Sequence, residues 1–301
     1  MGNSLLTGKK NSKKFRCPID MTEKNNSDTI LFTQVKNLAT VLDVGCGAGN
    51  LGIALNKMKS CKVYGIDNSI RQIAAARSSG AYEEVFNINL DENYGKMLDD
   101  YNDFFDCIIL GNTLQHLKNP QLLLGKLKKL LKDDGFMLIS VPNFAHASTK
   151  AELLNNDFNY GYENVFLNMQ PSKIFTGKNL PSFLSDINLR IENLKFTYKN
   201  LAGIKNTRSY SKLPCRIINY IFSNPHSFVK EYIIKTQKSD LTTNEIFDIN
   251  KEIFDNSPDE IKKSFLYKET FRDAKRKIDL IKRHNFLIFL NSCIMKKKRI
   301  S

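Results

Sequence analysis

The chain has 301 residues, of which 42% are hydrophobic, so it is long enough to bury a sizeable core. Its formal net charge is +14, but residues 1–194 hold 22 Lys+Arg and 20 Asp+Glu, whereas residues 195–301 hold 23 and 11. Because the excess of basic residues lies in the last third and not around one aromatic-lined region, the composition argues against a nucleic-acid-binding protein. The six cysteines show no C-x-x-C spacing, which argues against zinc and disulfide frameworks.

Near the start of the chain, residues 40–50 read T-V-L-D-V-G-C-G-A-G-N. The apolar residues predict a short buried strand, the three glycines Gly45, Gly47 and Gly49 permit positive φ, and residues 51–58 carry helical periodicity. Backbone amides at such a helix start can bind a polar ligand. The segment therefore predicts a loop that binds a nucleotide-type cofactor.

The glycine spacing decides between two cofactor classes. Residues 47–52 match the G-x-G-x-x-G pattern of dinucleotide sites, but counted from Gly45, which follows the strand, the third glycine position is Asn50. Asp43 would repel a pyrophosphate and attract an ammonium group. An NAD-dependent oxidoreductase is therefore the disfavoured alternative, and a ligand that carries an ammonium group is favoured.

A second apolar strand, residues 62–67, ends in Asp67, which is 22 positions after Gly45. A carboxylate at this place suits the two hydroxyls of a ribose. The alternative is an N-cap role, since Asp67, Asn68 or Ser69 could begin the helix that runs to Ser78. Both roles can coexist on neighbouring residues.

From Val41 to Val141 the chain resembles the class I S-adenosylmethionine-dependent methyltransferases. The resemblance implies a doubly wound, Rossmann-like α/β sheet of seven strands, with the ligand outside the carboxyl ends of the strands. It implies that S-adenosyl-L-methionine is the cofactor. The residues that would bind it are Asp43 and Gly45 for the methionine end, Cys46, Gly47 and Gly49 in the loop, Asp67 and Asn68 at the ribose, Asn89 and Leu90 at the adenine, and Gly111 and Asn112 after the fourth strand.

Residues 138–146 further resemble a bacterial subgroup encoded beside glycosyltransferases and related to ubiquinone-pathway O-methyltransferases, and the similarity reaches about residue 238. This implies methyl transfer to an oxygen, with nitrogen less favoured, of a small-molecule or glycan-linked acceptor. Asn168 and Pro171 stand where the subgroup carries Asp and His. A non-catalytic interaction protein with the same fold therefore remains an alternative.

Two histidines are candidates for the proton acceptor that an oxygen nucleophile needs. His116 follows the fourth strand and His146 follows the fifth, and we rank His116 first. The alternative for His116 is a capping or packing role before the helix at Pro120. Related enzymes have Glu-x-x-Glu-His at this turn, whereas this chain has Asn112 and Gln115, so we expect no tightly bound metal.

The sequence divides into a basic, flexible arm at residues 1–28, a methyltransferase domain at 29–238, and a basic helical extension at 239–301. The expected helices of the extension are residues 243–254, 259–283 and 286–295, with Pro258 as a break. The last of these helices is expected to pack on the domain, and peripheral contact with an anionic membrane is the alternative. The N-terminus lacks the apolar stretch of a signal peptide, so we expect a cytoplasmic protein.

Overall fold

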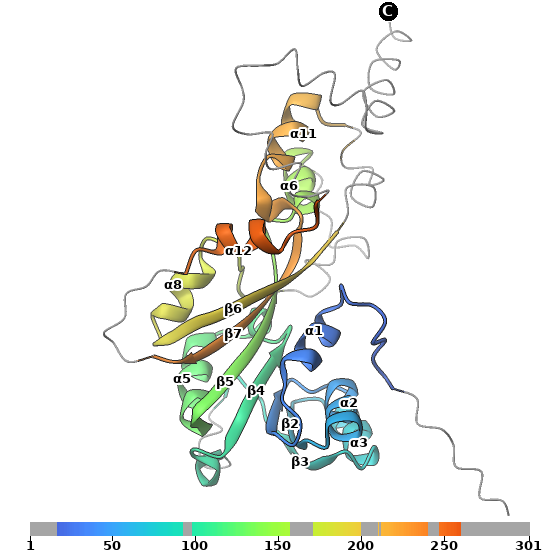
Figure 1. The fold of residues 1–301 in the computed structure, drawn as a ribbon, viewed down its shortest axis with the longest axis vertical. Helices are drawn as coiled ribbons and strands as arrows, with labels where there is room; N and C mark the ends of the chain where they lie inside the picture. The colour runs from blue at the N-terminus through green and yellow to red at the C-terminus, as the bar shows by residue number, and fades with distance from the viewer. Residues whose placement is uncertain are drawn as a thin grey trace, which may run out of the picture.

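The structure, a computed structural model, describes residues 17–92, 98–156, 171–199, 210, 212–239 and 247–259. It contains a sheet of seven strands in the order β3-β2-β1-β4-β5-β7-β6 (Figure 1). Neighbouring strands from β3 to β5 are parallel, and β7 runs antiparallel to both β5 and β6. The strands are β1 (Thr40–Val44), β2 (Lys62–Asp67), β3 (Tyr82–Asn87), β4 (Phe105–Gly111), β5 (Leu131–Pro142), β6 (Leu189–Tyr198) and β7 (Val229–Lys238). The predicted seven-stranded, doubly wound sheet is confirmed.

Helices cover both faces of the sheet, as Figure 1 shows. One face carries α1 (Ser27–Gln34), α2 (Asn50–Lys59) and α3 (Ile70–Ser78), and the other carries α5 (Pro120–Leu130) and α8 (Leu180–Ser185). Beyond the carboxyl end of β5 lie α6 (Ala147–Leu154) and α11 (Cys215–Phe222) (Figure 1). The remaining described elements are α12 (Ile249–Asn256) and the short helices η1 (Asp99–Tyr101), η2 (Leu114–His116) and η3 (Pro225–Ser227).

Side chains alternate between the two faces along β1, as the two-residue period of a strand requires. Leu42 and Val44 pack with α5 and α8, whereas Val41 packs with α1 and α2. Asp43 points to the same face as Val41 and is 4% exposed. The most polar residue of the strand is therefore buried beside the helix that follows the glycine loop.

The sequence-based boundaries around β5 need correction. The helical spacing of apolar residues predicts a helix over residues 121–132, and Asp133-Asp134-Gly135 predicts a turn before the fifth strand. In the structure, α5 ends at Leu130 and β5 begins at Leu131. The expected turn is instead an irregularity within the strand, because Leu131 pairs with Phe105 and Phe136 already pairs with Cys107. Gly135 allows this close packing, since a Cβ there would lie 2.9 Å from the carbonyl oxygen of Phe105.

The described part of the predicted N-terminal arm belongs to the domain. Ile19 is 6% exposed, and Ser27 begins α1. The predicted arm therefore extends too far, and residues 1–16 lie outside the described residues. In the C-terminal extension, α12 ends before Pro258 and buries Ile249 and Ile253, while residues 260–301 lie outside the described part. None of the described helices combines the length and hydropathy needed to cross a membrane.

Candidate cofactor and acceptor site

The glycine loop turns the chain sharply from β1 into α2. Gly45, Gly47 and Gly49 have φ values of 76°, 54° and 88°, which glycine adopts more readily than residues that carry a Cβ. The amides of Gly45 and Cys46 both donate to the Ile66 carbonyl oxygen, at 2.8 and 3.0 Å. A Cβ on Gly45 would lie 2.5 Å from Thr113 Oγ1, whereas a Cβ on Gly47 would meet nothing within 4 Å. The loop is therefore packed at Gly45 and open at Gly47.

Asp67 ties the loop to the end of β2. Its Oδ2 accepts from the Gly47 amide at 2.9 Å, and its Oδ1 accepts from the Ser69 amide at 2.8 Å. Ser69, two residues after Asp67, is the N-cap of α3, so Asp67 does not itself cap the helix. Each carboxylate oxygen can accept more than one hydrogen bond, and Asp67 is only half-buried. Its carboxylate can therefore still accept from two hydroxyls of a ligand.

Asp43 lies beneath the loop and is paired with a tyrosine that sequence reasoning missed. The Tyr82 hydroxyl donates to Asp43 Oδ2 at 2.9 Å. Burial raises the pKa of Asp43 to about 7, against the hydrogen bond from Tyr82, and the charges of Asp28 and Asp67 act in the same direction as burial. A cationic group bound near this carboxylate would restore its ionised form.

Three glycines make the space that the Tyr82 ring occupies. A Cβ on Gly49, Gly52 or Gly65 would lie 2.8, 2.2 or 2.9 Å from atoms of this ring. The glycines at positions 49, 52 and 65 are the only indication of this space in the sequence. Nothing in their spacing identifies the side chain that fills it. Tyr82 is therefore a support for Asp43 that only the fold reveals.

The predicted adenine-contacting residues follow β3. Asn89 is exposed, and its side chain stabilises its own turn by accepting from the Asp91 amide at 3.1 Å and donating to Glu92 Oε1 at 2.8 Å. Leu90 is half-buried against the core, and Asn68 is exposed at the end of β2. The structure brings these residues to the same sheet edge as Asp67, and their contacts with a cofactor stay predictions.

The end of β4 presents unpaired oxygen atoms. Asn112 has φ of 50°, and its amide donates to Ser140 Oγ at 2.9 Å, which joins β4 to β5. Gln115 Nε2 donates to the Asn112 carbonyl oxygen at 2.7 Å. Among the described residues, the buried atoms Asn112 Oδ1 and Gln115 Oε1 find no hydrogen-bond partner. Asn112 and Gln115 therefore leave hydrogen-bond acceptors open at this edge.

The two candidate histidines have different surroundings. His116 is exposed on η2, with its Nε2 3.3 Å from Gln115 Nε2. His146 is 3% exposed and caps α6, since its Nδ1 accepts from the Ser148 amide at 3.2 Å. Burial, together with the charges of nearby lysines, lowers the pKa of His146 to about 3, which makes it a weak base at neutral pH. The surroundings favour a structural role for His146, and catalysis by His116 stays a prediction.

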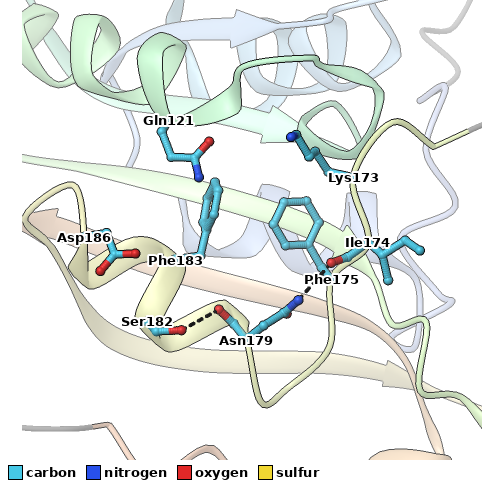
Figure 2. Close-up of a pocket in the computed structure, with 8 residues that line it drawn as sticks. All are labelled: Gln121, Lys173, Ile174, Phe175, Asn179, Ser182, Phe183 and Asp186. Atoms are coloured by element: carbon cyan, nitrogen blue, oxygen red, sulfur yellow. Dashed lines mark hydrogen bonds between the residues drawn. The ribbon is translucent and has the colours of Figure 1, made fainter.

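A pocket of about 250 Å³ lies next to this turn, between α5 and α8. Figure 2 shows Phe175 and Phe183 side by side, with ring centroids 5.1 Å apart, and Asn179 bonded to the carbonyl oxygen of Ile174 at 2.9 Å. The amides of Ser172 and Lys173 donate to the Gln115 carbonyl oxygen and hold this segment against η2. None of the residues predicted for the cofactor or for catalysis lines this pocket. Within the described part of the chain, no group of three His, Cys, Asp or Glu side chains could hold a metal ion.

Comparison with known proteins agrees with this arrangement. The chain is 26% identical over 166 residues to the mitochondrial ubiquinone biosynthesis O-methyltransferase of Dictyostelium discoideum, covering 52% of this chain and 51% of that protein. It is 30% identical over 112 residues to the (S)-coclaurine N-methyltransferase of Papaver somniferum, covering 35% of this chain and 30% of that one. The chain thus spans about half or less of the length of these curated relatives.

A solved methyltransferase structure from Aquifex aeolicus aligns with 72% of this chain and 94% of its own, with a TM-score of 0.46 and 15% identity. Residues 35–201, more than half of the chain, match the methyltransferase domain family. The fold and the family imply S-adenosyl-L-methionine as the cofactor. The chain therefore belongs to the methyltransferase domain family.

Proposed function

We propose that the protein transfers a methyl group from S-adenosyl-L-methionine to an oxygen or a nitrogen of a small-molecule acceptor. The observation that carries this proposal is the link from Asp67 to the Gly47 amide at 2.9 Å, which places a carboxylate beside an open glycine loop at the carboxyl edge of the sheet. The relatives include both O- and N-methyltransferases, which supports either acceptor atom. A glycan-linked acceptor is supported only by the subgroup resemblance of residues 138–146.

The residues present fit the cofactor. Asp67 would accept hydrogen bonds from the ribose hydroxyls, and Asp43 would hold the cationic methionine end through its negative charge. Asn112 Oδ1 is buried without a partner in the described structure, which suits a ligand that donates a hydrogen bond. When bound, the cofactor supplies a methyl group on a sulfonium, which is a good leaving group.

The remaining task of the chain is to position the acceptor and to take up its proton. Holding two reacting groups in line and free of water supplies much of the rate enhancement in such reactions. For an oxygen acceptor, we assign the role of proton acceptor to His116, which is exposed and lies on η2, the short helix that follows β4. A nitrogen acceptor that arrives uncharged needs no strong base.

The test is calorimetric titration of the full chain with S-adenosylhomocysteine and, separately, with NAD. We expect micromolar binding of S-adenosylhomocysteine, roughly a hundredfold weaker in Asp67→Ala because charge-assisted hydrogen bonds to both hydroxyls are lost. The matched control is Asp106→Ala, whose carboxylate pairs with Lys132 at the start of β4, and it should leave this affinity unchanged. Binding of NAD alone would favour an oxidoreductase, and binding of neither ligand by folded protein would favour a non-catalytic interaction protein.

A further inference from the structure

A second polar group of residues lies where β6 ends and β7 begins, beneath α1. Glu231 on β7 and Thr197 on β6 are directly opposite each other in the antiparallel ladder, so both side chains point to the same face of the sheet. Glu231 is 9% exposed and Thr197 is 3% exposed. The face they share is the one that buries Ile233, two residues after Glu231, against α1 and α2. A carboxylate and a hydroxyl are thus buried together beside Ile233, on a face that carries Lys195 and Lys235 farther along the two strands.

Each of these two side chains has one oxygen atom without a hydrogen-bond partner in the described structure. Glu231 Oε2 and Thr197 Oγ1 are both buried and find no hydrogen-bond partner there. The other carboxylate oxygen, Glu231 Oε1, lies 3.6 Å from Lys230 Nζ, whose side chain is 45% exposed. This contact is too long for a hydrogen bond and leaves Oε2 free. Because unsatisfied buried polar groups are costly, a ligand that donates hydrogen bonds to both atoms would be stabilised here.

Helix α1 brings a second carboxylate to the same place. Asn25, just before α1, pairs with the backbone of Tyr198, donating to its carbonyl oxygen at 2.7 Å and accepting from its amide at 2.9 Å. Leu31 and Phe32 are buried in the core, and Asp28 lies three and four residues before them, on the same face of the helix. The side chain of Asp28 is exposed. Desolvation by the protein packed around its carboxyl group, and then the charge of Glu231, still raises the pKa of Asp28. The two carboxylates therefore lie close enough to interact.

The strand register places this group beside the cofactor edge. Asn112 bonds to Ser140 on β5, and Glu231 pairs with Pro142, two residues farther along the same strand. Asn112 and Glu231 are thus separated by two strand spacings, roughly 10 Å. Leu31 of α1 approaches Gly111, since a Cβ on that glycine would lie 3.7 Å from Leu31 Cδ1. The group is near enough to the end of β4 to contact an acceptor that reaches this edge.

We propose that Asp28, Glu231 and Thr197 bind a protonated amine carried by the methyl acceptor. An ammonium group has three hydrogen-bond donors, and these residues offer two carboxylates and a hydroxyl oxygen. Glu231 is buried and Asp28 is exposed beside it, so the two carboxylates repel each other unless a cation compensates their charge. An ammonium ion does so with directed hydrogen bonds. The proposal rests on the proposed methyltransferase function and names the class of its acceptor. The proposal concerns how the acceptor is recognised: the protein binds the acceptor through its amine.

The experiment compares pairs of ligands that differ only in charge. Full-length protein saturated with S-adenosylhomocysteine is titrated calorimetrically with 2-phenylethylamine and with 2-phenylethanol, and then with matched indolyl and alkyl pairs. We expect at least one amine to bind tenfold or more tightly than its alcohol. Glu231→Gln and Asp28→Asn should each remove most of this preference, because the uncharged amides keep the shape and lose the charge. Glu231→Gln should bind S-adenosylhomocysteine as the unmodified protein does. Asp28→Asn should bind it at least as tightly, because the charge of Asp28 acts against ionisation of Asp43.

The matched control is Glu192→Gln, which makes the same change on β6 near the opposite end of the ladder, where Glu192 pairs with Lys235 at 3.0 Å. It should keep the preference for amines. Equal affinity for amines and alcohols, absence of binding for every amine, or binding of Mg²⁺ in place of the amines would overturn the proposal. Repeating the titrations without S-adenosylhomocysteine measures the affinity of the site for amines independently of the cofactor. Failure of the cofactor to bind therefore counts against the proposed function and not against the amine site.

Discussion

The two ends of the site, the glycine loop with Asp43 and the region beneath α1 with Glu231, each contain a buried carboxylate. The two carboxylates differ in whether the protein supplies a hydrogen-bond partner. Asp43 at the cofactor loop has its own partner, because the Tyr82 hydroxyl donates to it at 2.9 Å. Glu231 near α1 keeps one oxygen without a partner in the described structure. The first carboxylate is supported by the protein itself, and the second is left for a ligand. The difference indicates that the cofactor end is preorganised and the acceptor end is completed on binding.

The two ends also differ in how far apart their partners lie in the sequence. Asp67 and Gly47, which form the cofactor end, are 20 residues apart. Asn25 and Tyr198, which position α1 over the other end, are 173 residues apart. The cofactor end is thus built from neighbouring elements, whereas the acceptor end depends on closure of the whole domain.

The largest effect that would test this comparison is a change of stability with pH in Asp43→Asn. The folded-state pKa of Asp43 is raised from 3.8 to about 7, so its contribution to stability is present below pH 3.8 and is lost as the pH rises through about 7. At about 1.4 kcal/mol per pKa unit, the variant should become more stable than the unmodified protein by a few kcal/mol at pH 8. Urea unfolding without ligand at pH 5 and pH 8 measures this difference.

A suitable control is Asp106→Asn, which should change stability in the opposite direction at neutral pH. Burial acts to raise the pKa of Asp106, but hydrogen bonds from Lys132 and from the Thr40 amide outweigh it, and the pKa is lowered. Because both groups in this ion pair are partly exposed, the loss should stay at or below about 1 kcal/mol. A stability difference between Asp43→Asn and the unmodified protein that does not vary with pH would contradict the assigned burial of Asp43.

The next largest effect is a loss of stability at Gly52, where α2 packs against the Tyr82 ring. Gly52→Ala should destabilise the protein by about 1 to 3 kcal/mol, because a Cβ would lie 2.2 Å from the Tyr82 hydroxyl and 2.3 Å from the adjoining ring carbon. Gly125→Ala in α5 is the matched helical control, since a Cβ there meets nothing within 4 Å. It should stabilise by up to about 1 kcal/mol through helix propensity. If thermal unfolding shifted equally in both variants, Tyr82 would not be confined as described.

The smallest effect belongs to the anchor of α1. Asn25→Ala should cost about 1 kcal/mol, because two part-buried hydrogen bonds to Tyr198 are lost. Asn102→Ala removes only a local, exposed bond to the Asp99 carbonyl oxygen and should cost less. Asn25→Ala should also weaken amine binding while leaving the affinity for S-adenosylhomocysteine unchanged. Loss of both affinities together would show that the two ends of the edge are not independent.

Much of the parallel half of the fold could be predicted from local pattern. Residues 51–58 were expected to be helical, and α2 spans Asn50–Lys59. The turn expected at residues 133–135 was wrong, because pairing with β4 extends β5 back to Leu131. The Asp-Asp-Gly sequence has a high turn propensity, but pairing with a neighbouring strand overrides that propensity. Residues 157–170, which include Asn168, lie outside the described part of the chain, and Pro171 is the first residue after them.

The sequence by itself determined the cofactor end of this protein, because a strand, a glycine turn and a helix that follow one another must place Asp43, Gly45 and Asp67 at one edge of a parallel sheet. Only the tertiary structure decided what surrounds these residues. Tyr82 reaches Asp43 through space that three glycines leave free, and Glu231 meets Thr197 through the register of two antiparallel strands. Burial and pairing between distant segments depend on how strands align in the completed sheet, and no local pattern encodes that alignment.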